Sequence, residues 1–219
     1  MIEAVVFDLD GVLLDSEQVW DEVREQLARE RGGRWSERAQ ADMMGMSSPE
    51  WSRYMHDVVG LPEPPEEINA EVVRRMLARY RELLPLLPGA LEAVRRLGER
   101  WTLALASSSN RELIDAFVWV TGLDFRVTVS SEEVPRGKPA ADVFLEAARR
   151  LAVAPERCAA IEDSANGIRA AHAAGLLVVA IPNRHYPPLA DALAFADAVL
   201  CSLDELTVER LSAAAGGAR

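Results

Sequence analysis

From residue 88 to the C-terminus, short apolar runs alternate with longer segments of helical spacing. Strands are predicted over residues 101–106, 125–130, 158–161, 177–181 and, weakly, 198–201, with another over residues 4–7. Helices are predicted over residues 89–99, 111–121, 140–151 and 165–174, with one more at the C-terminal end. Strands joined by helices of this length form right-handed βαβ units, and strands apolar on both faces are typical of parallel sheets. The pattern predicts an α/β fold, a parallel sheet flanked by helices.

Residues 16–87 break this alternation. They show helical spacing without a clear strand, over residues 17–31, 36–43, 49–59 and 66–84. Ser16 is the candidate N-cap of the first of these helices, and residues 213–217 at the other end of the chain are expected to fray. We therefore predict an all-helical domain of residues 16–87, inserted after the first strand into a core made of residues 1–15 and 88–219. The two crossings, near residues 15–16 and 85–88, would be hinges.

Composition limits the partners and the compartment. The formal net charge of −11 argues against a nucleic-acid partner and against an anionic membrane surface. No apolar run is long enough to span a bilayer, and no basic segment followed by an apolar one stands at the N-terminus. Cys158 and Cys201 lie in apolar stretches, so two buried free thiols are expected. We expect a cytoplasmic protein whose oligomeric state the sequence leaves open; a monomer is compatible with it.

Two carboxylates stand where the first strand ends. Asp8 and Asp10 follow the apolar run 4–7, and an extended backbone places both on the same side. Two like charges this close are unfavourable unless a cation or a proton lies between them. A simple turn would explain one Asp and Gly11, but it does not require the third acid, Asp15. The segment is therefore a candidate catalytic or metal site.

Other polar groups occupy the ends of other predicted strands. They are Ser107, Ser108 and Asn110 after residues 101–106, Lys138 at the start of a helix, and Glu162 and Asp163 after residues 158–161. Each has an ordinary explanation by itself, as a helix cap or as a helix start with proline at the first position. Taken together, they are expected to converge, because the ends of parallel strands share one edge of the sheet.

The chemistry of these groups is complementary. Asp8, Asp10 and Asp163 offer the hard oxygens that Mg²⁺ prefers. Ser107 and the N–H groups that open its helix are suited to phosphate oxygens, and Lys138 adds a positive charge. A carboxylate nucleophile, a metal, a cation and an oxyanion cradle are what phosphoryl transfer through an aspartyl-phosphate requires. The sequence thus predicts Mg²⁺ as cofactor and a small-molecule phosphate ester as partner.

With these motifs, the chain resembles the haloacid dehalogenase (HAD) superfamily of phosphohydrolases, in the branch that includes β-phosphoglucomutase and phosphoglycolate phosphatase. Residues 7–17, Phe-Asp-Leu-Asp-Gly-Val-Leu-Leu-Asp-Ser-Glu, resemble the first motif of the family; Ser107 matches the second, Lys138 the third and residues 162–167 the fourth. The resemblance implies a Rossmann-like core with an all-helical cap inserted just after the first motif. The segment pattern predicts the same division.

The resemblance also implies roles for individual residues. Asp8 matches the nucleophile that is transiently phosphorylated, and Asp10 matches the general acid and base. The implied Mg²⁺ ligands are the Asp8 carboxylate, the main-chain carbonyl of Asp10 and Asp163, with Glu162 close to the metal. The implied phosphate clamp consists of Ser107 and Lys138, assisted by Ser108 and Asn110.

Substrate choice is expected to lie in the cap. The segment 43–48 resembles the specificity loop of the family, so Gly45, Met46 and Ser47 are candidate specificity residues, although its methionines are equally explained as core filler. Trp20 is a further candidate: β-phosphoglucomutase has at this position a histidine that serves the mutase cycle, and the tryptophan favours hydrolysis. Trp51 is expected to serve packing alone.

The predicted function is a Mg²⁺-dependent phosphatase for a small phosphorylated metabolite, either a sugar phosphate or a phosphoglycolate-like compound. A sugar phosphomutase is the alternative enzyme. A dehalogenase lacks a second acid at the position of Asp10. A phospho-accepting receiver domain has its acidic pair before the phosphorylated aspartate and no helical insertion.

Overall fold

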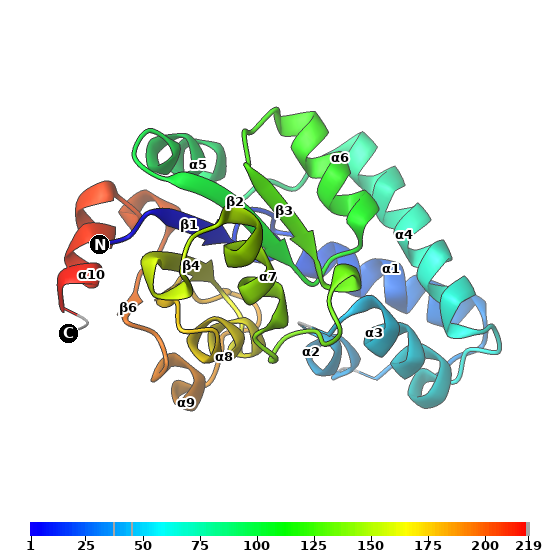
Figure 1. Cartoon of the computed structure of the whole chain (residues 1–219). Helices are drawn as coiled ribbons and strands as arrows, with labels where there is room; N and C mark the ends of the chain where they lie inside the picture. The colour runs from blue at the N-terminus through cyan, green and yellow to red at the C-terminus, as the bar shows by residue number, and fades with distance from the viewer. Residues whose placement is uncertain (37, 45, 218–219) are drawn as a thin grey trace.

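A six-stranded sheet forms the centre of the molecule, which the computed structural model describes over residues 1–36, 38–44 and 46–217. The strand order is β3-β2-β1-β4-β5-β6 (Figure 1), and all neighbouring strands are parallel. The strands are β1 (Ala4–Phe7), β2 (Thr102–Ser107), β3 (Val127–Ser130), β4 (Cys158–Glu162), β5 (Leu177–Ala180) and β6 (Ala198–Val199). The predicted parallel α/β sheet is confirmed, and its order is that of the doubly wound Rossmann-like fold.

Helices cover both faces of the sheet. One face carries α5 (Ala90–Gly98), α6 (Arg111–Thr121) and α10 (Val208–Gly217), and the other carries α7 (Asp142–Leu151), α8 (Ala165–Ala173) and the short α9 (Ala190–Leu193). Successive side chains of a strand point to opposite faces. Val5 and Phe7 of β1 accordingly belong to the hydrophobic cluster on the side of α5, α6 and α10. Ala4 and Val6 belong to the cluster on the side of α7 and α8. All four are fully buried.

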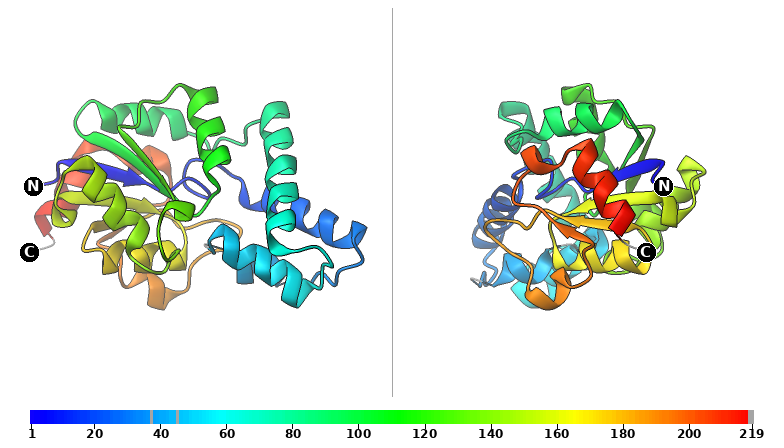
Figure 2. Two further views of the ribbon diagram at one scale, coloured as in Figure 1. Left: turned by 45° about the vertical axis from the view of Figure 1, so that its right-hand side comes forward. Right: turned by 90° about the vertical axis from the view of Figure 1, so that its left-hand side faces the viewer.

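Between β1 and α5 the described residues form helices and no strand. The helices are α1 (Glu17–Glu30), α2 (Ala39–Met43), α3 (Ser48–Tyr54), a π-helical continuation over Met55–Val59, and α4 (Pro65–Glu82). Figure 2 shows these helices to one side of the sheet, connected to it by two short segments of chain. We call residues 16–87 the helical insert. The helices predicted here occur, with ends that differ by at most three residues.

The two crossings between the core and the helical insert run side by side. Asp15 N–H donates to the Pro85 carbonyl at 2.7 Å, and Leu87 N–H donates to the Leu13 carbonyl at 3.0 Å. Leu14 forms an isolated antiparallel bridge nearby. The helical insert also touches the core through α4, which packs against α6 (Figure 1). The predicted hinge positions are therefore adjacent in space.

Three local expectations are wrong. Ser16 does not cap α1 with its side chain, because its backbone is already helical (φ −94°, ψ −14°) whereas an N-cap residue is extended. Its hydroxyl donates to Asp10 at 2.5 Å instead. Residues 213–217 continue α10, which packs on the core through Leu211. Cys201 is exposed because β6 ends before it, whereas Cys158 is buried, and both thiols are free. No helix in the described part of the chain has the length and apolarity to cross a membrane.

Candidate active site

The C-terminal ends of β1, β2 and β4 meet at one edge of the sheet. Phe7, the last residue of β1, is in register with residues of both neighbouring strands. Asp8 follows β1 directly, and Ser107 and Glu162 are the last residues of β2 and β4. In open α/β sheets, ligands bind in the crevice outside the strand ends where the strand order reverses. The fold therefore delivers these polar side chains to the expected ligand-binding edge.

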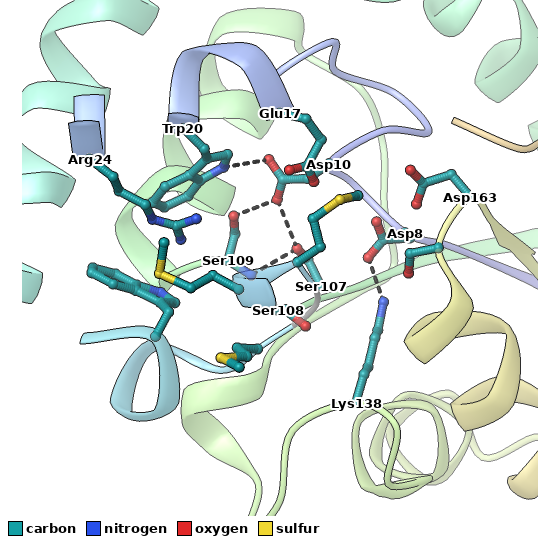
Figure 3. A pocket seen from close by; sticks show the side chains of 15 residues that line it. Asp8, Asp10, Glu17, Trp20, Arg24, Ser107, Ser108, Ser109, Lys138 and Asp163 are labelled. Carbon is teal, nitrogen blue, oxygen red and sulfur yellow. Dashed lines mark hydrogen bonds and ion pairs between the residues drawn. The ribbon is translucent and has the colours of Figure 1, made fainter. Parts of the chain in front are cut away.

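A cavity of about 40 Å³ lies at this edge, lined by residues of both the core and the helical insert (Figure 3). The core lines it with Asp8, Asp10, Ser107, Ser108, Ser109, Lys138, Asp163 and Ser164, and the helical insert lines it with Glu17, Trp20, Arg24, Met43, Met44, Met46 and Trp51. The structure thus brings together five of the predicted catalytic, metal-binding and phosphate-binding residues, which are Asp8, Asp10, Ser107, Lys138 and Asp163. Both the core and the helical insert therefore contribute side chains to this cavity.

Lys138 bridges two buried carboxylates in this cavity. Its ammonium donates to Asp8 Oδ1 at 2.5 Å and to Glu162 Oε1 at 2.6 Å, and it also donates to the Ala106 carbonyl at 3.2 Å. Burial alone would lower the pKa of Lys138, but the two ion pairs outweigh burial and raise it. The lysine is therefore a permanent cation at physiological pH.

Negative charge nevertheless predominates in this part of the site. Asp8, Glu162 and Asp163 each place a carboxylate oxygen within 4.8 Å of the others. Burial raises the pKa of Asp8 and of Asp163 well above the usual range, and the charges of neighbouring carboxylates reinforce this effect. The pKa of Asp8 stays raised despite its ion pair with Lys138, because burial contributes most and the charges of Glu162 and Asp10 add to it. The cluster requires further positive charge.

Two glycines make room for this cluster. A Cβ at Gly11 would lie 1.9 Å from Asp163 Oδ2, and a Cβ at Gly167 would lie 1.9 Å from the Glu162 carboxyl. Gly11 also has a φ of 81°, in the left-handed region that favours glycine. Asn183 donates to Asp163 Oδ2 at 3.2 Å and fixes its orientation. Closely spaced and rigidly held carboxylate oxygens fit a hard divalent cation such as Mg²⁺.

The Asp10 carboxylate points away from Lys138 toward the helical insert (Figure 3). Its Oδ1 accepts from Ser16 Oγ at 2.5 Å and from Trp20 Nε1 at 3.1 Å. Its Oδ2 accepts from Ser109 Oγ at 2.5 Å and from Ser107 Oγ at 3.4 Å. Two of these donors belong to the helical insert and two to the core, so Asp10 is bound to both parts of the molecule at their boundary.

The predicted phosphate-binding residues separate into two groups. Ser107 and Ser108 line the cavity beside Lys138, and Ser107 Oγ accepts the N–H of Ser109 at 3.0 Å. Asn110 is not among the lining residues. Its amide donates to Asn69 of the helical insert at 3.1 Å and to Glu132 at 2.7 Å. Asn110 therefore ties the core to the helical insert, and its contact with a phosphate stays a prediction.

The predicted specificity residues also separate. Trp20 and Met46 line the cavity. Ser47 does not line it; its hydroxyl and its N–H both donate to Glu50, at 2.5 and 2.8 Å, in a capping box that starts α3. Gly45 lies outside the described residues. The structure thus gives Ser47 a local folding role that the sequence analysis did not assign to it.

Several cavity residues were not predicted, among them Glu17, Arg24, Ser109 and Trp51. Burial raises the pKa of Glu17 to about 7 and lowers the pKa of Arg24 to about 10. Glu17, Trp20 and Arg24 follow the i, i+3, i+7 spacing of one helix face. The sequence therefore held one signal for these residues: Glu17 and Arg24 are charged but lie on the apolar face of α1.

Comparison with known proteins identifies the family. Residues 2–175 match the model of the haloacid dehalogenase-like hydrolase family, and this chain belongs to it. Hexitol phosphatase B of Escherichia coli K12 is 34% identical over 220 residues, which cover 96% of each chain. The prediction of a HAD-type phosphoric monoester hydrolase is confirmed at the level of this family and its named phosphatases.

Solved structures show the same fold. The phosphate complex of CbbY from Rhodobacter sphaeroides has a TM-score of 0.83 and 28% identity, and the match covers 97% of this chain and 100% of that one. A β-phosphoglucomutase from Clostridium difficile has a TM-score of 0.84 and 24% identity, with 99% and 98% of the two chains covered. This second likeness concerns the fold alone. Together they confirm the Rossmann-like HAD fold predicted from the sequence.

Proposed function

We propose that this protein is a Mg²⁺-dependent phosphatase that hydrolyses a small phosphorylated metabolite, a sugar phosphate or a phosphoglycolate-like compound, through an aspartyl-phosphate. The observation that carries the proposal is the lining of one cavity by Asp8, Asp10, Ser107, Lys138 and Asp163. Membership of a hydrolase family and a phosphatase relative that covers nearly the whole chain support the same reaction.

Asp8 is the proposed nucleophile. One of its carboxylate oxygens attacks phosphorus, the bond from phosphorus to the ester oxygen breaks, and the phosphoryl group is transferred to Asp8. Lys138, which already contacts Asp8 Oδ1 at 2.5 Å, balances the negative charge that the phosphoryl oxygens bring into the site. Ser107, beside it in the cavity, is positioned to donate to one of these oxygens.

Asp10 is the proposed general acid and base. It protonates the leaving alkoxide in the first step, and its carboxylate then takes a proton from the water that attacks the phosphoaspartate. The second step releases inorganic phosphate and restores the Asp8 carboxylate. The four hydroxyl and indole donors around Asp10 hold its carboxylate in one orientation between these two proton transfers.

Asp8, Asp163 and the main-chain carbonyl of Asp10 would hold Mg²⁺, and the ion would neutralise charge on the phosphoryl oxygens. Glu162 is bound to Lys138 and, through Oε2, accepts the backbone N–H of Asp163 at 3.0 Å, so we assign it to orienting these neighbours. We further propose that residues 16–87 act as a cap on the core of residues 1–15 and 88–219. A closed cap excludes bulk water during transfer and opens for exchange of substrate and product.

The decisive experiment measures phosphate release from a panel of phosphate monoesters, with and without Mg²⁺, for the native protein and for Asp8→Asn. We expect native turnover to require Mg²⁺ and the variant to lose it by at least about a thousandfold, because the amide is not a nucleophile. Asp57→Asn, the same change at an exposed residue of the helical insert, is the control. Turnover retained by Asp8→Asn would overturn the assignment of the nucleophile.

The product distinguishes the alternative enzyme. A sugar phosphomutase would return an isomerised sugar phosphate and little free phosphate. In the structure, the indole of Trp20 donates to Asp10 at 3.1 Å and is not a base at any physiological pH. This contact supports hydrolysis as the proposed reaction.

A further inference from the structure

The wall of the cavity formed by the helical insert contains a buried guanidinium. Arg24, only 4% exposed, has its Cζ 4.4 Å from the ring centre of Trp20 and 4.7 Å from that of Trp51. Its Nη1 donates to Gln40 Oε1 at 3.0 Å. Its Nε is buried and has no hydrogen-bond partner among the described residues. Figure 3 shows the group at the opposite end of the cavity from Lys138.

Gln40 connects this arginine to a carboxyl group. Gln40 Nε2 donates to Glu17 Oε2 at 2.8 Å, while Gln40 Oε1 accepts from Arg24. Both polar atoms of the amide are therefore engaged within the trio. Glu17 and Arg24 are buried residues that also line the cavity. The trio presents donors from Arg24 and an acceptor from Glu17 to the same space.

The unpartnered nitrogen of Arg24 implies a ligand. A buried donor without an acceptor is unfavourable, and a guanidinium presents its N–H groups as a planar fork. Gln40 occupies Nη1 at one side of this fork, and the indole rings of Trp20 and Trp51 contact the group. Nε is thus a donor without an acceptor, in a side chain that lines the cavity.

The charges of the cavity limit what these oxygens are. Among the described residues, its lining contains four carboxyl groups, from Asp8, Asp10, Glu17 and Asp163, and two cationic side chains, Arg24 and Lys138. The phosphoryl group of a substrate already brings negative charge to the Lys138 end. A second phosphate or a carboxylate at the other end would lie close to further carboxylates. A hydroxyl, in contrast, accepts from Arg24 and donates to Glu17 without adding charge.

We propose that Arg24 and Glu17, held by Gln40, form a distal subsite that binds the hydroxyl groups of an uncharged polyol or sugar moiety on the phosphate ester. The methionines of the wall (Met43, Met44 and Met46) and the two indoles offer apolar surface to its C–H groups. This inference rests on the proposed phosphatase function and narrows its substrate class. It assigns binding and specificity to Arg24, and no part of the chemical step.

The test compares kcat/KM for glucitol 6-phosphate with kcat/KM for acetyl phosphate, which has no hydroxyl groups and no distal anion. Phosphoglycolate and fructose 1,6-bisphosphate report on a distal carboxylate and on a distal phosphate. The native protein is expected to prefer glucitol 6-phosphate over phosphoglycolate and over the bisphosphate by about tenfold or more, since a lost pair of hydrogen bonds costs at least that much. This arm requires no variant.

Arg24→Met supplies the second arm. The ratio of kcat/KM for glucitol 6-phosphate to that for acetyl phosphate is expected to fall by about tenfold or more. Arg29→Met is the matched control, because Arg29 lies on the exposed side of the same helix, with its side chain 73% exposed, and it should leave the ratio unchanged. Glu17→Gln should lower the ratio by less, because an amide oxygen still accepts a hydroxyl proton.

Three results would overturn the proposal. One is a native preference for phosphoglycolate or for the bisphosphate. Another is an equal loss for both substrates in a folded Arg24→Met protein, which would show that the arginine only supports the structure. If the native protein releases phosphate neither from any of the phosphate esters nor from acetyl phosphate, which is an acyl phosphate, the phosphatase function fails first and the subsite fails with it.

Discussion

At the scale of single residues, the site is an acidic cluster with more carboxyl groups than cations. Asp8, Glu162 and Asp163 share the single ammonium of Lys138. Burial raises the pKa of Asp163, and the charges of Glu162 and Asp8 add to this effect. Keeping Asp163 buried therefore lowers the stability of the fold above the pH at which the unfolded carboxyl ionises, and a divalent cation that bound only the folded state would offset this cost.

We predict that Asp163→Asn has two opposite consequences. Without metal, its melting temperature should be higher than that of the native protein at pH 7, because the amide removes a buried charge. With Mg²⁺ at about a hundred times its dissociation constant, the free energy of unfolding of the native protein should rise by about 3 kcal/mol. That of the variant should hardly change. Thermal unfolding with and without MgCl₂ checks both, with Asp57→Asn as control. An equal response to Mg²⁺ in the variant would exclude Asp163 as a ligand.

Glu17 gives a pH-dependent prediction at the same scale. Burial, mainly, and the charge of Asp10 raise its pKa from 4.5 to about 7, although Arg24 and Gln40 oppose them. Between these two pH values the unfolded chain ionises Glu17 while the folded chain keeps its proton. This residue therefore lowers stability as pH rises through that range, by up to about 3 kcal/mol.

Glu17→Gln removes this dependence. Relative to the native protein, the variant should gain up to about 3 kcal/mol in free energy of unfolding between pH 4 and pH 8. Urea unfolding of both proteins over this range measures the difference, and contributions from other titrating groups cancel when the two are subtracted. A difference that stays constant with pH would show that Glu17 ionises in the folded state as it does in the unfolded state.

A site residue could be predicted from the sequence where its position next to a strand decides its contacts. It could not be predicted where residues distant in the chain decide them. Asp8 and Asp163 directly follow strands, so the sheet alone fixes where they lie. Asn110 has the same kind of position, but its amide is engaged by Asn69, 41 residues earlier in the chain. Arg24 was not predictable as a site residue, because a charged residue in a helix ordinarily faces solvent. Its burial depends on Gln40 and Trp51, which other helices supply.

At the scale of elements, Ser47 shows how a loop of the helical insert is fixed. The capping box with Glu50 satisfies free N–H groups at the start of α3. This helix carries Trp51 into the cavity wall. The core loop before Lys138 also lies against Ser47, because a Cβ at Gly137 would be 2.9 Å from Ser47 Cβ.

We predict that Ser47→Ala lowers the free energy of unfolding by about 1 kcal/mol, the usual cost of a lost N-cap. Because Ser47 does not line the cavity, kcat/KM should change by less than about threefold, a smaller loss than a direct substrate contact would give. Denaturant unfolding and steady-state kinetics test both parts. Ser36→Ala, in the stretch before α2, is the control. A large loss of activity with unchanged stability would restore Ser47 to the specificity residues.

The helices and strands themselves were largely predictable. Apolar runs such as residues 4–7 are buried on both faces, so composition alone marks them as central strands. The helical insert was recognised by the absence of such runs. The end of α10 and the exposure of Cys201 were not predictable, because both depend on which surface the last helix covers. Local sequence determines the type of each element, and tertiary packing determines where it ends.

At the scale of the whole molecule, a few polar contacts join the core and the helical insert. Asn110 donates to Asn69 at 3.1 Å, and Asn166 donates to the Met44 carbonyl at 3.1 Å. The covalent connection is limited to two adjacent crossings. Since the core and the helical insert both line the cavity, we expect the entry of a metabolite to require that the two parts move apart.

Asn69→Ala tests this view, because Asn69 lies outside the cavity lining and contributes to closure alone. Loss of one hydrogen bond of about 1 kcal/mol should shift the equilibrium about fivefold toward the open arrangement and raise KM by at most about fivefold, with a larger radius of gyration in solution scattering. Asn166→Ala, which removes the contact to Met44, should act in the same direction. Gln26→Ala changes an exposed amide bonded only within α1 and should alter neither quantity. If both asparagine variants keep the native KM and radius, these contacts do not control closure, and the helical insert is held by its apolar packing against the core.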